Sequence, residues 1–229
     1  MATYVLLHGA YQGGWIWQRV APHLRAAGHT VFAPTLDGCA ERRQTLRPGI
    51  DTESHAAEIA ELLFYEDLHD VVLAGTSCGG MVAARVAETA RDRIGRIVLA
   101  DALALFDGET VADHVKRPGA VTDTIGTGPS RDDAANRMFV SLDSATKDWA
   151  LARYTPHPVA AMANPVKLAS FWRQDWNASV IWCRQSVNPP VSHQRRAAET
   201  LKARWYELDT GHYPMLTEPK ALAGLMMAQ

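Results

Sequence analysis

The stretch DVVLAGTSCGGMVAARVAE, residues Asp70 to Glu88, contains the strongest structural signal in the sequence. An apolar run, Val71–Ala74, leads directly into the glycine-rich segment GTSCGG and then into a helix-like pattern. Two nucleophilic side chains, Ser77 and Cys78, stand next to each other in that turn. The pattern predicts a buried strand, a sharp turn and a helix, with a reactive side chain presented at the turn.

The positions of the glycines decide between the two nucleophiles. In a strand–turn–helix of this kind, side chains two residues before and two residues after the central residue collide, and glycine removes both collisions. With Ser77 at the centre, these positions are Gly75 and Gly79, whereas with Cys78 at the centre the first would be the β-branched Thr76. The spacing therefore favours Ser77 as the nucleophile. Cys78 is expected to contribute its backbone N–H to an oxyanion hole at the start of the helix.

Short apolar runs alternate with helical patterns along most of the chain. We expect strands at 4–7, 30–33, 71–74, 96–100, 180–183 and 204–208, and helices at 17–27, 52–63, 80–89, 194–203 and 219–227. This alternation predicts one α/β domain over residues 1–229, with a mostly parallel sheet covered by helices on both faces. Residues 103–168 interrupt the alternation and are too long for an ordinary loop, so we interpret them as an inserted, mostly helical cap.

Composition excludes several classes of protein. The formal net charge is −2 and lysine and arginine are scattered, which disfavours nucleic acid or an anionic membrane surface as a partner. We find no signal peptide, and no apolar run approaches the roughly 20 residues that cross a bilayer. Cys39, Cys78 and Cys183 have neither disulfide-like nor metal-like spacing. We therefore expect a cytoplasmic protein without a metal; the sequence leaves the oligomeric state open, a homodimer included.

An early segment, Val5 to Val20, reads VLLHGAYQGGWIWQRV. A predicted strand ends there at His8-Gly9, and the turn after an early strand supplies the second oxyanion donor in folds with this type of nucleophile turn. Gly9 allows close backbone approach, so Ala10 is the expected N–H donor and Tyr11 the second choice. His8 precedes the serine in the chain, and we interpret it as a structural residue that braces the turn.

A late segment, Trp205 to Met226, places a histidine directly after the last predicted strand. That strand ends at Leu208, and the following turn presents Gly211-His212 before Pro214. A base on this turn would lie above the serine, because the carboxyl ends of parallel strands share one edge of the sheet. Among the nine histidines, we therefore select His212 as the general base.

Three motifs now carry a resemblance to a known family. The motifs are HGAxxGGWxW, GxSCGG and GHxPMxxxP, at residues 8–17, 75–80 and 211–219. They resemble the α/β-hydrolase superfamily, and within it the branch of hydroxynitrile lyases, plant methylesterases and bacterial esterases. The resemblance implies a Ser-His-acid hydrolase that needs no cofactor and cleaves small carboxylic esters.

The lyases of that branch differ at two positions. They carry a threonine after the motif histidine and a lysine after the catalytic histidine, where this chain has Gly9 and Tyr213. Gly9 offers no hydroxyl to the substrate, and Tyr213 cannot supply the positive charge that stabilises a departing cyanide. Cyanohydrin cleavage is therefore disfavoured, and ester hydrolysis fits. Two alternatives stay open. One is a hydrolase of lactones or activated amides, and the other is a small-ligand receptor with the same fold.

The acid of the triad is the least determined member. The branch usually places it after the strand at 180–183, but this chain has QSVNPP at 185–190, without a carboxylate. Asp101 ends the neighbouring run RIVLA and is our first choice. Asn188 is the alternative, although an amide cannot stabilise the imidazolium charge. Four other aspartates fit less well: Asp37, Asp107, Asp175 and Asp209.

The sequence allows two interpretations of five large apolar residues, three of which lie in the proposed cap. Trp149, Tyr154 and Met162, together with Trp15 and Phe171, would either line an apolar pocket or pack the cap on the core.

Overall fold

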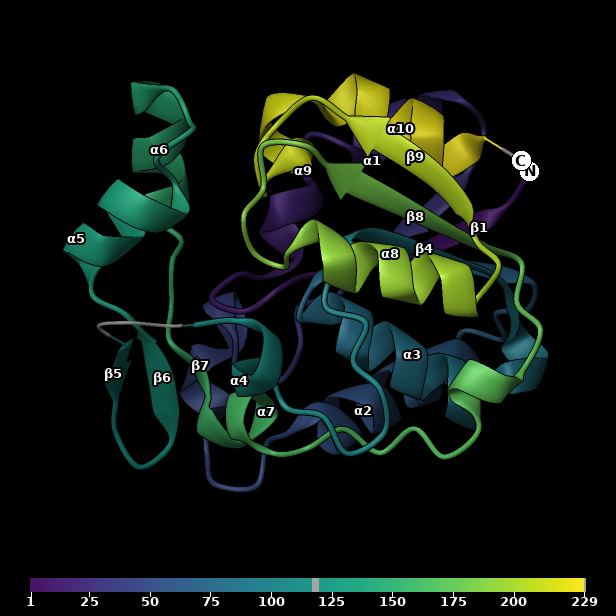
Figure 1. The fold of residues 1–229 in the computed structure, drawn as a ribbon, viewed down its shortest axis with the longest axis horizontal. Helices are drawn as coiled ribbons and strands as arrows, with labels where there is room; N and C mark the ends of the chain where they lie inside the picture. The colour runs from purple at the N-terminus through teal and green to yellow at the C-terminus, as the bar shows by residue number, and fades with distance from the viewer. Residues whose placement is uncertain (117–119, 229) are drawn as a thin grey trace.

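The computed structural model describes residues 1–116 and 120–228. Its centre is a six-stranded sheet in the order β2-β1-β3-β4-β8-β9, and every recorded pair in it is parallel (Figure 1). The strands are β1 (Thr3–Leu7), β2 (Thr30–Phe32), β3 (Val71–Ser77), β4 (Ile94–Ala102), β8 (Ala178–Cys183) and β9 (Arg204–Leu208). The predicted fold class is thus confirmed, with strand positions within a few residues of those expected.

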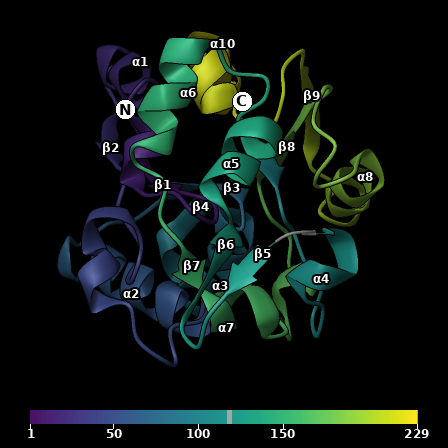
Figure 2. The same cartoon turned by 90° about the vertical axis from the view of Figure 1, so that its left-hand side faces the viewer.

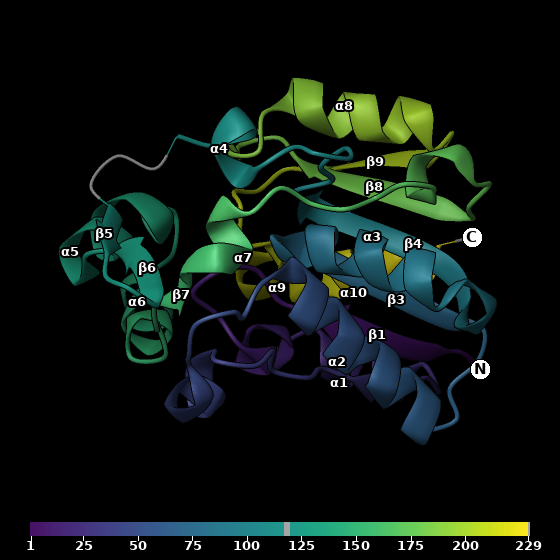
Figure 3. The same ribbon diagram turned by 90° about the horizontal axis from the view of Figure 1, so that it is seen from below.

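Helices cover both faces of this sheet (Figures 1 and 3). The longer ones are α2 (Thr52–Tyr65), α3 (Gly79–Thr89) and α8 (Val191–Thr200) on one face, and α1 (Ala21–Ala26) and α10 (Pro219–Met227) on the other. Strand residues alternate between the two cores. Val5 and Leu7 of β1 belong to the first, and Tyr4 and Leu6 to the second. Both cores are apolar, which explains why the strands appear in the sequence as continuous apolar runs.

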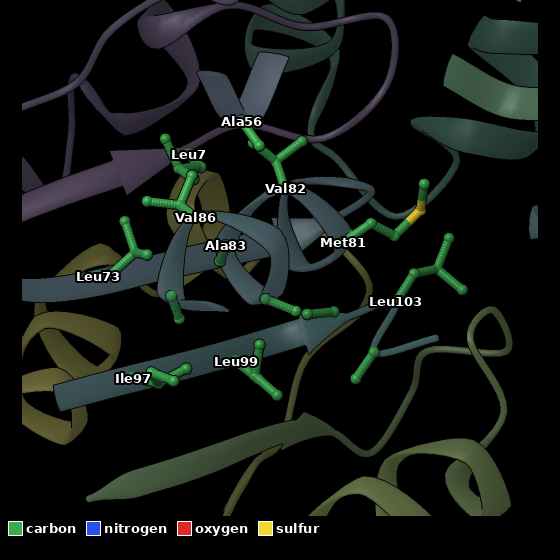
Figure 4. Packing of buried hydrophobic residues seen from close by; sticks show 14 of the residues in the cluster. Leu7, Ala56, Leu73, Met81, Val82, Ala83, Val86, Ile97, Leu99 and Leu103 are labelled. Atoms are coloured by element: carbon green, nitrogen blue, oxygen red, sulfur yellow. The ribbon is translucent and has the colours of Figure 1, made fainter. Parts of the chain in front are cut away.

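The helix that follows Ser77 is the most deeply buried of these elements. Met81, Val82, Ala83 and Val86 of α3 pack against strand residues such as Leu73 (Figure 4). All of these side chains are at most 3% exposed. Extensive packing of α3 on the sheet fixes the turn between β3 and α3, and with it the position of Ser77.

One expected helix differs in the structure. The segment expected as a helix from Trp17 to Ala27 is instead a 3₁₀ turn, Gly14–Trp17, followed by the short α1. Pro22 explains the later start, because proline is accommodated only in the first turn of a helix. Further short helical segments are Ala40–Thr45, Arg91–Arg93, Phe171–Arg173 and α9 (Pro214–Thr217).

The segment between β4 and β8 forms a lobe beside the sheet (Figures 1 and 2). It contains α4 (Val111–His114), α5 (Arg131–Asp133), a π-helical turn (Ala134–Met138), α6 (Ser144–Leu151) and α7 (Val159–Ala163). It also contains a three-stranded antiparallel sheet of β5 (Ala120–Thr122), β6 (Gly126–Pro129) and β7 (His157–Pro158). The short helices agree with the expected cap, but the sheet was not expected. That this lobe acts as a cap stays a prediction.

Among the described residues, no helix is both long enough and apolar enough to cross a membrane.

Candidate active site

Ser77 lies at the turn between β3 and α3 in the left-handed backbone region, with φ of 48°. A Cβ atom on Gly75 would approach the Gly79 carbonyl oxygen to 2.4 Å, and one on Gly79 would approach the Leu7 carbonyl oxygen to 2.5 Å. Both approaches are closer than real contacts allow. The two glycines therefore have the steric function that their spacing predicted, and the unusual backbone at Ser77 presents its side chain above the sheet.

The structure brings Asp101 and His212 into direct contact. Asp101 lies near the end of β4, and His212 lies in the turn between β9 and α9. Asp101 Oδ2 is 2.5 Å from His212 Nδ1. Because a carboxylate only accepts, the histidine ring must donate from Nδ1, which leaves Nε2 as the basic nitrogen.

The carboxylate of Asp101 is fully buried. Its second oxygen, Oδ1, accepts a hydrogen bond from the backbone N–H of Cys183 at 3.4 Å. Its backbone is also left-handed, with φ of 47°. This conformation and the two hydrogen bonds hold the carboxylate in one orientation toward His212.

A cavity of about 290 Å³ connects the predicted site residues. Its walls include Ser77, His212, Ala10 and Cys78, and they also include lobe residues such as Met162. The sequence thus selected, from three separate segments, residues that meet at one cavity. The volume is near the lower end of the range for small-molecule sites, about 300–1,000 Å³.

The turn after β1 lies against Ser77. A Cβ atom on Gly9 would be 2.7 Å from Ser77 Cβ, so only glycine leaves room for the nucleophile. His8 is 1% exposed; its Nε2 accepts from the Leu36 N–H at 3.0 Å and its Nδ1 lies 2.8 Å from the Gly9 carbonyl oxygen. Burial lowers the pKa of His8 to about 4, so its ring is neutral near neutral pH. His8 is a structural residue, as interpreted from the sequence.

This contact also orients the next peptide group. With Nε2 accepting, the neutral His8 ring donates from Nδ1 to the Gly9 carbonyl oxygen. The carbonyl of Gly9 and the N–H of Ala10 belong to one trans peptide and point in opposite directions. The N–H of Ala10 is therefore directed away from His8. Ala10 itself lines the cavity.

The alternative acid, Asn188, lies on the cavity wall. Its backbone carbonyl accepts a hydrogen bond from the Ser186 hydroxyl, and the side-chain contact to His212 is made by Asp101. The other aspartates have structural contacts. Asp37 pairs with Arg42 and Arg47, Asp209 pairs with Arg184, and Asp107 accepts from the Leu168 N–H.

The aromatic residues of the lobe mainly pack rather than line the cavity. Trp149 contacts Trp15 edge to face, with ring centroids 5.1 Å apart, and the Tyr154 hydroxyl donates to the Pro129 carbonyl. Of the five residues considered for the pocket, Met162 is on the cavity wall. Other apolar side chains on the wall were missed in the sequence: Leu103, Val111, Val115, Met138, Val140 and Val187. They lie in loops and short helices without periodicity, so no local signal marked them.

Cys39, Cys78 and Cys183 are buried, and none of the three forms a disulfide. Among the residues that the structure describes, no group of three or more histidine, cysteine, aspartate or glutamate side chains is arranged to hold a metal ion.

Comparison with known proteins agrees with the observed fold. A family model described as the alpha/beta hydrolase family matches residues 4–225. The chain belongs to the alpha/beta hydrolase family. This membership confirms the resemblance that the three motifs indicated.

The relatives include several named as esterases. The chain is 31% identical over 182 residues to the "Carbendazim hydrolyzing esterase" of Nocardioides sp. (strain SG-4G), covering 74% of each chain. It is 26% identical to "Methylesterase 3" of Arabidopsis thaliana, over 97% of this chain and 94% of the relative. An extracellular alpha/beta-hydrolase from a Paenibacillus species has the same fold, with a TM-score of 0.84 at 24% identity, covering 99% and 98% of the two chains.

Proposed function

We propose that this protein hydrolyses small carboxylic esters through an acyl-enzyme, with Ser77 as nucleophile, His212 as base and Asp101 as acid. Ester hydrolysis is the activity that the esterase and methylesterase relatives carry in their names. The observation that carries the residue assignment is the 2.5 Å contact between Asp101 Oδ2 and His212 Nδ1, with His212 and Ser77 on the same cavity.

The chemistry proceeds in two halves. Ser77 Oγ attacks the ester carbonyl carbon while His212 Nε2 takes the hydroxyl proton, and the carbonyl oxygen becomes an oxyanion. The backbone N–H groups of Ala10 and Cys78 stabilise that oxyanion, each by about 3 kcal/mol in the transition state. His212 then gives its proton to the leaving alcohol. In the second half, water loses a proton to His212, attacks the acyl carbon and releases the acid together with regenerated Ser77.

Asp101 supports this cycle in two ways. Its carboxylate fixes the histidine tautomer whose Nε2 is basic, and its charge stabilises the imidazolium that forms after proton transfer. Asn188, an amide on the cavity wall, supplies no such charge. The residues at the two lyase positions argue against cyanohydrin cleavage, because Gly9 has no hydroxyl and Tyr213 carries no positive charge.

Other features of the protein remain proposals from the sequence. The three buried cysteines without a disulfide support a reducing, cytoplasmic location. The proposal that the protein has no nucleic-acid partner rests on composition alone. The sequence leaves the oligomeric state open, a homodimer included.

Two matched variants test the proposal. Ser77→Ala removes the attacking hydroxyl and should abolish hydrolysis of p-nitrophenyl acetate, whereas Cys78→Ala keeps its backbone N–H and should retain much of the activity. Circular dichroism and thermal unfolding verify that both variants fold. Full activity of Ser77→Ala would exclude the acyl-enzyme. Tight, saturable ligand binding with very slow turnover of every ester in a panel of methyl, p-nitrophenyl and lactone substrates would indicate a receptor instead.

A further inference from the structure

Tyr213 follows the proposed base directly in the turn after β9. It is 3% exposed, and it forms part of the cavity wall. Its ring lies between Phe139 and His212, at centroid distances of 4.9 Å and 5.2 Å. The proposed mechanism gives this phenol no role, although Tyr213 is the residue next to His212 in the chain.

Gln12 is the polar neighbour of this phenol. It is 2% exposed, lines the same cavity and lies two residues after Ala10. Its Oε1 accepts from the Gly9 N–H at 3.3 Å, and its side chain lies beside the Tyr213 hydroxyl. Gln12 therefore connects the turn that carries the oxyanion donor with the turn that carries His212.

The Tyr213 hydroxyl has a hydrogen that it can donate to a bound molecule. The Gln12 oxygen already accepts from the Gly9 N–H, so the NH₂ group is the part of this amide that remains to donate toward the phenolic oxygen. Burial raises the pKa of Tyr213, so the phenol stays protonated near neutral pH. Among the described residues, the hydroxyls of Tyr4 and Tyr154 donate to backbone carbonyls, whereas no protein acceptor is recorded for the hydrogen of Tyr213.

A donor on a cavity wall gains a hydrogen bond from a bound molecule that supplies an acceptor, and it is left unpaired by a bound molecule that does not. Sites built in this way discriminate strongly against analogues that lack the matching polar atom, because the donor is then left unpaired. The cavity wall also carries apolar side chains such as Met138 and Leu103, and polar ones such as Ser141 and Arg137.

We propose that the Tyr213 hydroxyl, held by Gln12, is a specificity-determining donor, and that the preferred substrates are esters with a second hydrogen-bond acceptor beside the scissile ester group. This inference rests on the proposed function for turnover. Hydroxy-, alkoxy- and keto-substituted esters belong to this class, whereas simple alkyl esters do not.

Two isosteric substrate pairs test the proposal. Methyl methoxyacetate and methyl butyrate differ by one oxygen in the acyl half, and 2-methoxyethyl acetate and butyl acetate differ by one oxygen in the alcohol half. For each pair we would measure the ratio of kcat/KM in the wild type and in Tyr213→Phe, which removes only the hydroxyl. Because the same ratio is compared between the two proteins, the difference in intrinsic reactivity between the two esters cancels. We expect Tyr213→Phe to lower the ratio in at least one pair by about 10- to 100-fold.

Tyr4→Phe is the control, because its buried hydroxyl bonds to the Met226 carbonyl and is not part of the cavity wall. It should leave both ratios unchanged. Equal ratios in wild type and Tyr213→Phe for both pairs would overturn the assignment, even with Ser77-dependent hydrolysis established. A uniform loss on all four esters would also overturn it, since that result indicates a structural role.

Binding separates this inference from the proposed function. In Ser77→Ala, and in Ser77→Ala with Tyr213→Phe, the dissociation constants of the same four esters can be measured by ligand-observed NMR without turnover. A preference for an oxygenated ester that requires the Tyr213 hydroxyl would support the assignment even if the wild type hydrolysed none of them. Equal affinities in both backgrounds would exclude it.

Discussion

Replacing Asp101 by asparagine is the most informative perturbation of the proposed triad. Asparagine is nearly isosteric with aspartate and tolerates the left-handed backbone that Asp101 adopts, so the fold should be retained. In the wild type, Oδ1 accepts from the Cys183 N–H and Oδ2 accepts from His212. The amide oxygen should keep the first bond, which places the NH₂ group against the histidine.

An NH₂ group at that position reverses the tautomer of His212. Nδ1 must now accept, so the ring proton moves to Nε2, and the nitrogen proposed as the base can no longer take the Ser77 proton. The charge that stabilises the imidazolium is lost as well, and full burial of the side chain prevents water from replacing it. The same substitution lowers kcat about 10⁴-fold in serine proteases, which corresponds to about 5 kcal/mol of transition-state stabilisation.

The assay is steady-state hydrolysis of p-nitrophenyl acetate, with urea unfolding to compare stability. We expect Asp101→Asn to lose three to four orders of magnitude in kcat, about 10⁴ at most, with a near-normal unfolding midpoint. Asn188→Ala is the matched control and should lose about tenfold or less. Asp101→Asn activity within tenfold of wild type, in a folded protein, would refute the reasoning. A large loss in Asn188→Ala would then transfer the orienting role to that residue.

Three further predictions concern neighbouring features. Gly9→Ala places a Cβ 2.7 Å from Ser77 Cβ, so kcat for p-nitrophenyl acetate should fall about 10²-fold; an unchanged kcat would contradict this. Mandelonitrile should release no cyanide above the spontaneous rate, because Gly9 and Tyr213 occupy the lyase positions; cyanide release lost in Ser77→Ala would show the opposite. Burial lowers the pKa of both His8 and His193 to about 4. Between pH 6.5 and 4 the unfolded chain therefore binds more protons than the folded protein. The free energy of unfolding should fall as the pH falls through this range, by up to about 3 kcal/mol per histidine. His193→Gln should reduce this loss in urea titrations at pH 7 and 4.5, and an unaltered pH dependence would contradict the assignment.

Much of the fold and site follows from local sequence signals. The spacing of Gly75 and Gly79 around Ser77 is a steric requirement, and the structure shows the backbone atoms that impose it. His212 could be selected because it is the histidine that directly follows the last strand, and parallel strands end at a common edge. Such signals survive in a single sequence because each depends on a few neighbouring residues.

The lobe and the cavity wall depend on contacts between distant segments, so the sequence defined them poorly. The strands β5, β6 and β7 are two to four residues long, too short for an alternating pattern, and β7 pairs with β6 across the intervening helices α5 and α6. The Gln12–Tyr213 contact joins turns two hundred residues apart in sequence, and neither residue belongs to a pattern that predicts the other. Local signals cannot report such pairs.

The position of the carboxylate has a consequence for the rest of the site. The end of β4 lies next to the end of β8 in the sheet, so Asp101 reaches His212 and also accepts from the N–H of Cys183, the last residue of β8. A carboxylate on β4 therefore occupies the space that an acid from the loop after β8 would fill. With Asp101 as the proposed acid, that loop has no need to carry a charge, and residues 185–189 instead line the cavity. Loops that do not hold a catalytic group tolerate more changes, so we infer that variation in this loop alters which esters bind while the Ser77, His212 and Asp101 geometry stays fixed.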